Sequence, residues 1–406
     1  MSDKKYSFKY PELILVPVLY ALGLGLRLFF FYSASADTYA FELWFRSIRE
    51  IGDLSVFTDF VGDYNVPYIA LMYFVTLLPF SDFVCVKLIA LFFDLFGVVA
   101  GFLFGRELAH QAGENIDTAR HFGELCAALI WLSPITIGNG GYQAQLEAMW
   151  AFNGFLAVYM FCKKRPVPGM IFFAISFAMK PQGIFFLPFI FLFYYRSKSF
   201  SVLHFLIVPA VIQVLSIPSM IGGNSFFYFW KHFFEQSGLY PFVYYYYPNI
   251  WIWMRNLPYY VFGKVGIGMM ITAFLLYTVK YVGVCRKKNW TLSMDLELLL
   301  WSVMTCTMFL PAMHERYNYP VEVMLPVLAV FEKKYRIPAA VLVLSGLLCN
   351  GMSYYGWGKA EFYGLSLLNM AVYACLTAGV IGSLRSQRED AQVTSSEGSS
   401  VKGGAA

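Results

Sequence analysis

The ionisable residues that could carry chemistry stand beside the apolar segments of the sequence rather than inside them. Asp37 follows the first apolar segment directly, and Glu147 begins another one. Lys180 lies between two apolar segments in Met-Lys-Pro-Gln, and residues 314–316 read His-Glu-Arg. A carboxylate can remove a proton, and cations can bind a phosphate. If helices bring these residues to one membrane face, they could catalyse a reaction at the lipid surface.

Each of these residues also has a purely structural interpretation. Asp37 could be a solvated loop acid, Lys180 could extend its ammonium to the membrane interface, and residues 314–316 could form a salt-bridged helix cap. Asp94 is the clear acid within an apolar segment, where it could serve a proton path or a structural hydrogen bond. The tyrosines at 244–247 could stack on a sugar or an isoprenoid, or form an aromatic belt at the membrane interface.

The composition places these residues in a membrane protein. The chain has 406 residues, of which 59% are hydrophobic and 14% are charged, whereas a soluble domain has about 25% charged residues. The apolar residues come in runs of roughly 17–22, the length that crosses a hydrocarbon core. These values argue against a soluble enzyme, a nucleic-acid-binding protein or a disordered protein. We expect an all-α polytopic membrane protein with one domain at 1–384 and a disordered cytoplasmic tail at 385–406.

The apolar segments predict a bundle of about 11–13 transmembrane helices. Loops rich in Lys and Arg should face the cytoplasm, which places both termini there and the chemical residues outside. For the helices to alternate in this way, one segment between 64 and 138 must not cross the membrane. We expect it to be 66–80, which is the shortest and is bounded by prolines. The candidate spans are 11–32, 66–80, 84–105, 122–138, 144–162, 167–178, 183–195, 201–221, 261–284, 294–311, 319–331, 337–352 and 362–384.

Two of the expected external segments are more than connectors. In the first external loop, 33–64, apolar residues recur at helical spacing between 38 and 51. This spacing predicts an amphipathic helix that lies in the membrane interface. The second large loop, 222–260, is rich in aromatic residues.

Several short motifs together resemble one family of enzymes. The most specific are Phe-Ala-Met-Lys-Pro-Gln-Gly-Ile-Phe at 177–185 and Phe-Leu-Pro-Ala-Met-His-Glu-Arg-Tyr at 309–317. The chain resembles the bacterial multi-pass mannosyltransferases related to GPI mannosyltransferase II, within the GT-C class of polyprenyl-phosphate-sugar-dependent glycosyltransferases. The other segments that carry the resemblance are Asp37 with Trp44, 63–68, 134–147 and 248–251.

The resemblance implies a GT-C-like fold and the transfer of one sugar, mannose in that family, from a lipid carrier. The carrier would be undecaprenyl or dolichyl phosphate in a plasma membrane, and the acceptor an external glycan, lipid or protein. Asp37 would be the general base of an inverting reaction, with Glu147 as the second catalytic residue. Arg316 is the first candidate for the carrier phosphate, because a guanidinium binds phosphate with two N–H groups. The remaining substrate-binding residues that the resemblance implies are Lys180, Gln182, His314, Glu315, Gln145, Trp44 and Asn249.

No metal or other cofactor is expected, because the sequence has no dense cluster of oxygen ligands and no nucleotide-binding motif. The sequence departs from the family pattern near Glu147, where Gln143 replaces a tryptophan, Ala144 a glycine and Glu147 itself an aspartate. The resemblance therefore does not specify the sugar. The alternative function is a multi-pass transporter or lipid flippase. Such a protein should have ionisable residues at the membrane midplane, which Asp94 fits, and an internal repeat, which is not visible.

Overall fold

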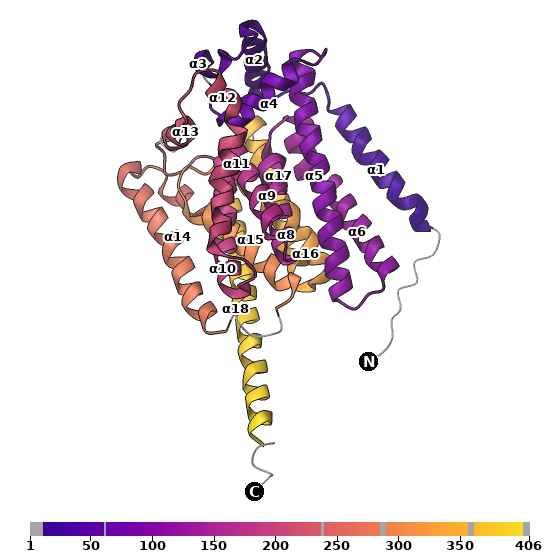
Figure 1. Ribbon diagram of the computed structural model, residues 1–406. Helices are drawn as coiled ribbons and strands as arrows, with labels where there is room; N and C mark the ends of the chain where they lie inside the picture. Colours follow the sequence, from indigo (N-terminus) through magenta and orange to yellow (C-terminus); the bar gives the residue numbers. More distant parts are fainter. Residues whose placement is uncertain (1–10, 61, 237–238, 285–289, 356–360, 401–406) are drawn as a thin grey trace.

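The computed structural model describes residues 11–60, 62–236, 239–284, 290–355 and 361–400. Within these residues every regular element is a helix, and no strand occurs (Figure 1). The helical architecture agrees with the prediction of an all-α multi-pass membrane protein.

Short connections join most of the helices. The α-helices are α1 (Pro11–Phe29), α2 (Ala36–Ile51), α3 (Val56–Asp59), α4 (Val66–Thr76), α5 (Asp82–Gln111), α6 (Ile116–Trp131), α7 (Pro134–Thr136), α8 (Glu147–Cys162), α9 (Pro166–Met179), α10 (Leu187–Ser197), α11 (Ile207–Leu215), α12 (Ile217–Ile221), α13 (Tyr228–Gln236), α14 (Tyr259–Val282), α15 (Leu292–Phe309), α16 (Tyr319–Phe331), α17 (Arg336–Tyr355) and α18 (Glu361–Ser400). The helical segments of other types are the π-helix η1 (Ile137–Tyr142) and the 3₁₀ helices η2 (Pro181–Phe186), η3 (Val202–Leu206), η4 (Ile250–Met254) and η5 (Lys333–Tyr335).

Five helices in the described part of the chain are long and apolar enough to cross a membrane, and α6 with the bent segment that follows it would make six. The other apolar helices have 10–17 residues, fewer than the roughly 20 that a straight span needs. The predicted 11–13 spans therefore require shorter helices to cross as well. The five candidate spans are Asp82–Gln111, Tyr259–Val282, Leu292–Phe309, Lys333–Met352 and Phe362–Gln387.

The segment that we expected not to cross forms α4, a helix of 11 residues. At 1.5 Å per residue it is about 16 Å long, roughly half the thickness of a hydrocarbon core. It packs against α2 at the end of the bundle opposite the C-terminus (Figure 1). This length is short for a membrane span, and the expectation that the segment does not cross stays a prediction.

The amphipathic helix predicted over 38–51 is present as α2. Ser35 and Thr38 close its start as a capping box, and Gly52, with a φ of 77°, ends it in the left-handed region. Its predicted position in the membrane interface stays a prediction. The apolar face, with Phe41 and Phe45, is buried in the protein core against α4 and α5. The helix is therefore held rigidly by protein packing.

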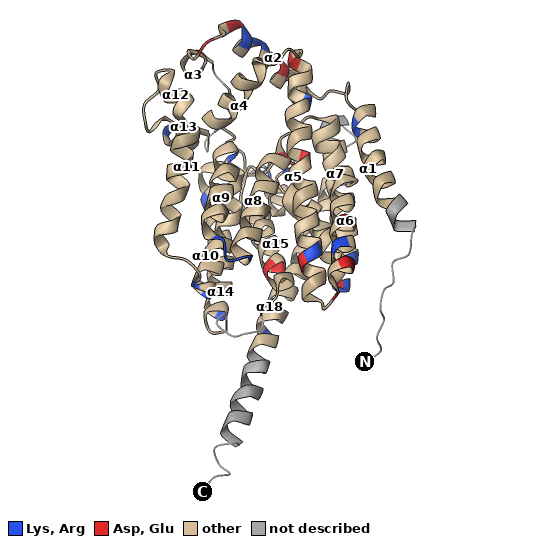
Figure 2. Cartoon of the chain, turned by 45° about the vertical axis from the view of Figure 1, so that its right-hand side comes forward, with Lys and Arg blue, Asp and Glu red and all other residues tan. Residues whose placement is uncertain are grey.

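The ends of the bundle carry most of its charge. Figure 2 shows that Lys, Arg, Asp and Glu gather toward the two ends and are sparse between them, as expected for a protein with an apolar middle. The aromatic loop 222–260 is not a plain connector, because it contains α13 and η4.

The expectation of a disordered tail at 385–406 stays a prediction. Helix α18 continues from the apolar segment through Ser400, while residues 401–406 lie outside the described part. An existing helix extends more easily than a new one nucleates, which explains the continuation into a polar sequence.

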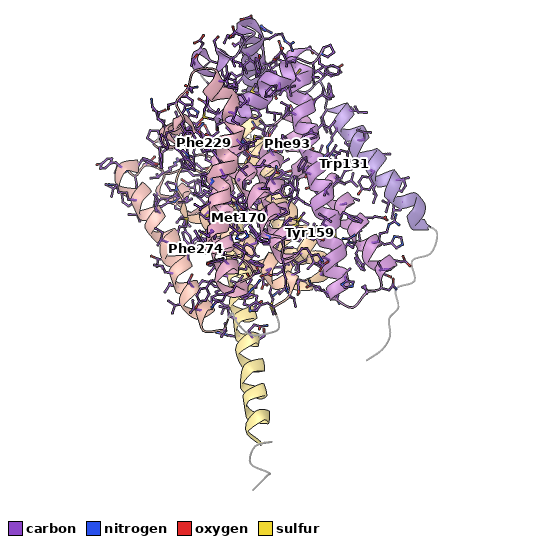
Figure 3. All side chains as sticks on the ribbon, viewed as in Figure 1. Phe93, Trp131, Tyr159, Met170, Phe229 and Phe274 are labelled. Atoms are coloured by element: carbon purple, nitrogen blue, oxygen red, sulfur yellow. The ribbon has the colours of Figure 1, made fainter. Side chains whose placement is uncertain are left out.

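The centre of the bundle is formed by α8 and α15. Nearly all their side chains are buried, whereas α14 buries only four residues. Aromatic side chains fill the space between the helices, among them Tyr159 of α8 (Figure 3). A residue at the start of α8 therefore stands on a rigid support.

Candidate active site

A cavity of about 350 Å³ lies where α2, the α9–η2 junction and the segment before α16 meet. Residues from distant parts of the chain line it, and its walls are both polar and aromatic. Five of the predicted polar residues are in the wall, together with Trp44. They are Asp37, Lys180, Gln182, His314 and Arg316.

Lys180 reaches the cavity because α9 stops one residue before it. Pro181 follows, and a residue before proline favours extended backbone, which Lys180 adopts with φ −147° and ψ 132°. The 3₁₀ turn η2 then folds tightly back on α9. A Cβ at Gly183 would lie 2.6 Å from backbone atoms of Ser176 and Phe177, so this close approach requires glycine.

Glu147 is fully buried at the first position of α8 and does not line the cavity. Its Oε2 accepts a hydrogen bond from Trp150 Nε1 at 2.5 Å. Its Oε1 accepts from Lys180 Nζ at 2.5 Å and from Arg316 Nε at 3.1 Å. The helix N-terminus also favours a negative charge there. Glu147 is thus a buried anchor that holds two cations at the cavity wall.

Arg316 pairs with three carboxylates. Besides Glu147, its Nη1 lies 2.5 Å from Glu315 Oε1, and its Nη2 lies 3.3 Å from Asp37 Oδ2. Its side chain is only 13% exposed. His314 Nδ1 lies 3.9 Å from Glu315 Oε2, beyond hydrogen-bond distance.

Asp37 is the most exposed acid of this cluster, with 38% of its side chain accessible. It stands in the first turn of α2, and its Oδ2 accepts a hydrogen bond from Gln145 Nε2 and faces Arg316. Its other oxygen, Oδ1, has no hydrogen-bond partner among the described residues. A carboxylate in this arrangement can accept a proton from a molecule in the cavity.

The segment that carries Gln145 is fixed from both sides. Thr38 Oγ1 donates to the carbonyl of Gln143 at 2.6 Å, which ties this segment to the start of α2. Lys87 Nζ donates to the carbonyls of Gly141 and Tyr142 at 2.9 and 2.7 Å. The backbone turns sharply at Ala144, with φ 52°, and a similar turn at Ala312, with φ 55°, precedes His314. These bonds and turns set the position of Gln145 against Asp37.

Burial and neighbouring cations determine the charge of the cavity wall. Burial, followed by the charges of Arg316 and Lys180, lowers the pKa of His314 to about 2, so its ring is neutral near pH 7. Burial also lowers the pKa of Lys180, and Glu147 opposes this effect. The ammonium lies 5.6 Å from the ring centre of Tyr64 and 5.3 Å from that of Tyr317, so it contacts aromatic faces as well as a carboxylate.

The structure brings together all but one of the predicted site residues. Gln145, Glu147 and Glu315 lie behind the wall, in direct contact with Asp37 or Arg316. Asn249 is the exception. Its Oδ1 accepts from Trp251 N at 3.0 Å, and its Nδ2 donates to the Thr307 carbonyl at 2.9 Å. It caps η4 and is not among the residues that line the cavity.

Other residues of the cavity were not singled out in the sequence. Asp63, Tyr64, Tyr240 and Tyr317 line it, three of them beside or within motifs that carried the resemblance. No regular spacing marks them, because each comes from an irregular connection. Lys87 does not line the cavity but holds the Gly141 and Tyr142 carbonyls. The sequence could have pointed to it, because a lysine within an apolar segment is unusual.

The buried acid Asp94 belongs to a separate pair. Arg27 Nε of α1 lies 2.8 Å from Asp94 Oδ2 of α5. The guanidinium also lies 3.6 Å from the ring centre of Trp131 in α6 and donates to its carbonyl at 2.7 Å. The pair therefore joins three helices.

Within the described residues, no group of three or more His, Cys, Asp or Glu side chains is placed to hold a metal ion. Comparison with protein-family models and with curated protein sequences found no match for the chain. The resemblance to the GT-C mannosyltransferases therefore remains a prediction from the motifs.

Proposed function

We propose that this protein is an integral-membrane glycosyltransferase that moves one sugar from a polyprenyl-phosphate donor to an acceptor, with inversion at the anomeric carbon. One observation carries the proposal. An accessible carboxylate, Asp37, faces the same cavity as Lys180 and Arg316, although the three residues come from distant parts of the chain. A base and two phosphate-binding cations are the groups that this transfer needs.

The reaction forms one bond to the anomeric carbon and breaks another. The acceptor hydroxyl oxygen attacks the anomeric carbon while Oδ1 of Asp37 takes the hydroxyl proton. The bond between that carbon and the phosphate oxygen breaks, and the polyprenyl phosphate leaves with the electron pair. Attack from the side opposite the phosphate inverts the configuration of the sugar. General-base assistance of this kind contributes about 10²–10⁴-fold to the rate.

Fixed cations stabilise the charge that develops on the leaving phosphate. Arg316 and Lys180 are already held in place by Glu147, so they need little reorganisation when the charge forms. Neutral His314 can donate one N–H to a phosphate or sugar oxygen. We assign Glu147, Glu315 and Gln145 to positioning, because they touch Arg316 or Asp37 rather than the cavity.

An apolar groove beside the cavity supports a lipid-linked donor. The groove has a volume of about 580 Å³, runs between α10 and α14, and shares Ile184 and Phe185 with the cavity. Its walls include Phe191 and Met270 and are almost entirely apolar. A prenyl chain could lie in this groove while its phosphate enters the cavity.

The proposed enzyme is a GT-C-like bundle of about 11–13 membrane passes in a plasma membrane. Both termini face the cytoplasm, and the cavity faces outward. The acceptor would be a glycan, a lipid or a protein. The proposal draws on the motif resemblance for these features and on the basic loops for the orientation.

The test is incubation of purified protein in liposomes with radiolabelled polyprenyl-phosphate sugars and a glycan and lipid extract as acceptor. Label should leave one carrier and appear in an acceptor. Asp37→Asn should lower this transfer about 10²–10⁴-fold, whereas Glu42→Gln, on the exposed side of the same helix, should not. Near-normal transfer by folded Asp37→Asn protein would rule out the assigned base.

The second candidate function is a transporter or lipid flippase, favoured by the buried pair of Arg27 and Asp94 between helices. A flippase would move a fluorescent polyprenyl-phosphate sugar across the liposome membrane without cleaving it. Movement of the intact donor without loss of its sugar would favour this function over glycosyl transfer.

A further inference from the structure

The negative and positive charges of the ionised side chains around Arg316 are unequal in number. Three carboxylates, those of Asp37, Glu147 and Glu315, surround two cations, Arg316 and Lys180. The ring of His314 adds no charge near pH 7. Counted over the described contacts, the cluster thus has one excess negative charge before any donor binds. A donor phosphate adds another negative charge, which is unfavourable unless one of the carboxylates moves away from the cations or takes up a proton.

The three carboxylates are not equally able to move. Glu147 is fully buried and also accepts hydrogen bonds from Trp150 and Lys180. Glu315 is 4% exposed and lies 2.5 Å from the guanidinium. Asp37 has the longest contact with Arg316, 3.3 Å, and its side chain is 38% exposed. Asp37 is therefore the carboxylate whose ion pair breaks most easily.

We infer that the donor phosphate and Asp37 compete for Arg316, so that donor binding frees Asp37 and makes it a stronger base. The inference rests on the proposed function and adds an order of events to it. Before the donor arrives, the guanidinium engages the carboxylate, with Nη2 3.3 Å from Oδ2 of Asp37. Once the phosphate occupies Arg316, Asp37 loses this partner and gains a negatively charged neighbour, which favours uptake of a proton by the carboxylate.

Gln145 keeps the freed carboxylate in place. Its amide donates to Oδ2 of Asp37, and its own segment is fixed by Thr38 and Lys87. Asp37 can therefore lose its pair with Arg316 without leaving the cavity. The reactive form of the base then exists only when a donor is present, which disfavours an order in which the acceptor is deprotonated first.

The competition makes a distinctive prediction for binding. Removing the charge of Asp37 should tighten the binding of a prenyl phosphate, although the same change abolishes transfer. The matched control is Asp63→Asn, which removes a carboxylate from the wall of the same cavity. Asp63 forms no ion pair with Arg316 among the described contacts, so it reports the general effect of one charge.

The experiment measures the affinity of purified full-length protein in detergent for farnesyl phosphate, by calorimetry at constant salt. Asp37→Asn should bind about tenfold more tightly than the wild type, and Asp63→Asn within about twofold of it. Asp37→Ser provides a second variant if the amide disturbs the fold, with thermal unfolding as the check. Inorganic phosphate in a parallel titration shows how much of the effect belongs to the phosphate alone.

The outcomes separate this inference from the proposed function. Tighter binding without transfer supports both. Loss of transfer with unchanged or weaker binding in both Asp37 variants overturns the competition and leaves the base assignment standing. An equal gain in the Asp63→Asn control also overturns it. Tighter binding with normal transfer supports the competition and removes Asp37 from its role as the base.

Discussion

Arg316 Nε lies 3.1 Å from Glu147 Oε1, and 169 positions of the sequence separate the two residues. The contact joins the segment before α16 to the first turn of the central helix α8. It fixes the position of the Arg316 guanidinium in the cavity wall, with Nη2 of Arg316 directed at Asp37. A single buried carboxylate thereby fixes the relation between the two sides of the candidate active site.

Glu147→Gln should destabilise the fold strongly, because it removes the carboxylate that pairs with buried Lys180 among the described contacts and one of the three that pair with Arg316. Breaking a buried pair of this kind costs about 3–5 kcal/mol. Thermal unfolding followed by tryptophan fluorescence in detergent measures the effect. Glu235→Gln is the control, since its pair with Lys231 is exposed and spans 3.8 Å, and it should change stability by less than about 0.5 kcal/mol. Equal stability of the two variants would contradict the anchoring role.

Arg316→Lys should weaken donor binding at least about tenfold, although the charge is kept. An ammonium cannot contact Glu147, Glu315 and Asp37 with separate N–H groups in the fork geometry of a guanidinium. The Michaelis constant for the polyprenyl-phosphate sugar measures the change. Arg46→Lys on the exposed side of α2 serves as the reference. An unchanged Michaelis constant in Arg316→Lys would argue against phosphate binding at this residue.

Thr38→Val should lower the turnover number more than it changes the Michaelis constant for the donor. The valine keeps the shape but loses the 2.6 Å hydrogen bond to the Gln143 carbonyl, which holds the Gln145 segment against α2. The lost hydrogen bond costs about 0.5–1.5 kcal/mol, because Ser35 Oγ still donates to this carbonyl at 3.4 Å. Steady-state kinetics separate the two constants. Thr58→Val, at an exposed position, should alter neither, and a pure stability loss with normal turnover in Thr38→Val would exclude the positioning role.

The protein should lose stability as the pH falls below about 6.5, partly because of His314. The pKa of its buried ring is lowered to about 2 in the folded state, whereas an unfolded histidine titrates near pH 6.5. Between these values the unfolded chain binds a proton that the folded chain does not, so acid favours unfolding. The groups that surround the ring are Lys180, Arg316, Glu315, Tyr240, Tyr245 and Tyr317.

His314→Gln should therefore reduce this acid sensitivity by about 1 kcal/mol between pH 7 and pH 5.5. Thermal unfolding at several pH values in that range measures it. His110→Gln is the comparison, because its side chain is exposed. The same pH dependence in the wild type and in His314→Gln would show that the ring does not titrate as described.

Met270→Trp should fill the groove between α10 and α14 and weaken the binding of long-chain donors. Excluding two CH₂ groups, at about 0.8 kcal/mol each, corresponds to about tenfold in affinity. A farnesyl donor, which needs less of the groove, should be affected less. Leu276→Trp on the same helix does not line the groove and is 66% exposed, so it should discriminate little between chain lengths. Equal effects on both donors would place the prenyl chain elsewhere.

Parts of this arrangement were predictable because they depend on local sequence. Long apolar runs give α5 and α14, and Pro181 fixes where α9 ends beside Lys180. The depth of Glu147 was not predictable, since its burial results from the packing of α8 among other helices. Asn249 caps η4 and does not line the cavity, and the sequence could not show this because asparagine caps turns as readily as it binds a ligand.

The position of α2 shows the same limit. The spacing of its apolar residues predicts the helix but cannot distinguish a lipid surface from a protein surface, because both are apolar. Only the packing of Phe41 and Phe45 against α4 and α5 makes that distinction. The approach of Asp37 to Arg316 likewise depends on contacts between segments far apart in the chain.

Ala144 and Ala312 adopt a backbone conformation that glycine enters freely and alanine only at a cost of about 1–2 kcal/mol. The tight turns before Gln145 and His314 are thus imposed by the packed helices on either side and not by local preference. A synthetic peptide copied from either turn would not keep its bend in isolation. Conversely, an engineer could place glycine at either position to relieve the strain while the surrounding scaffold preserves the path of the chain.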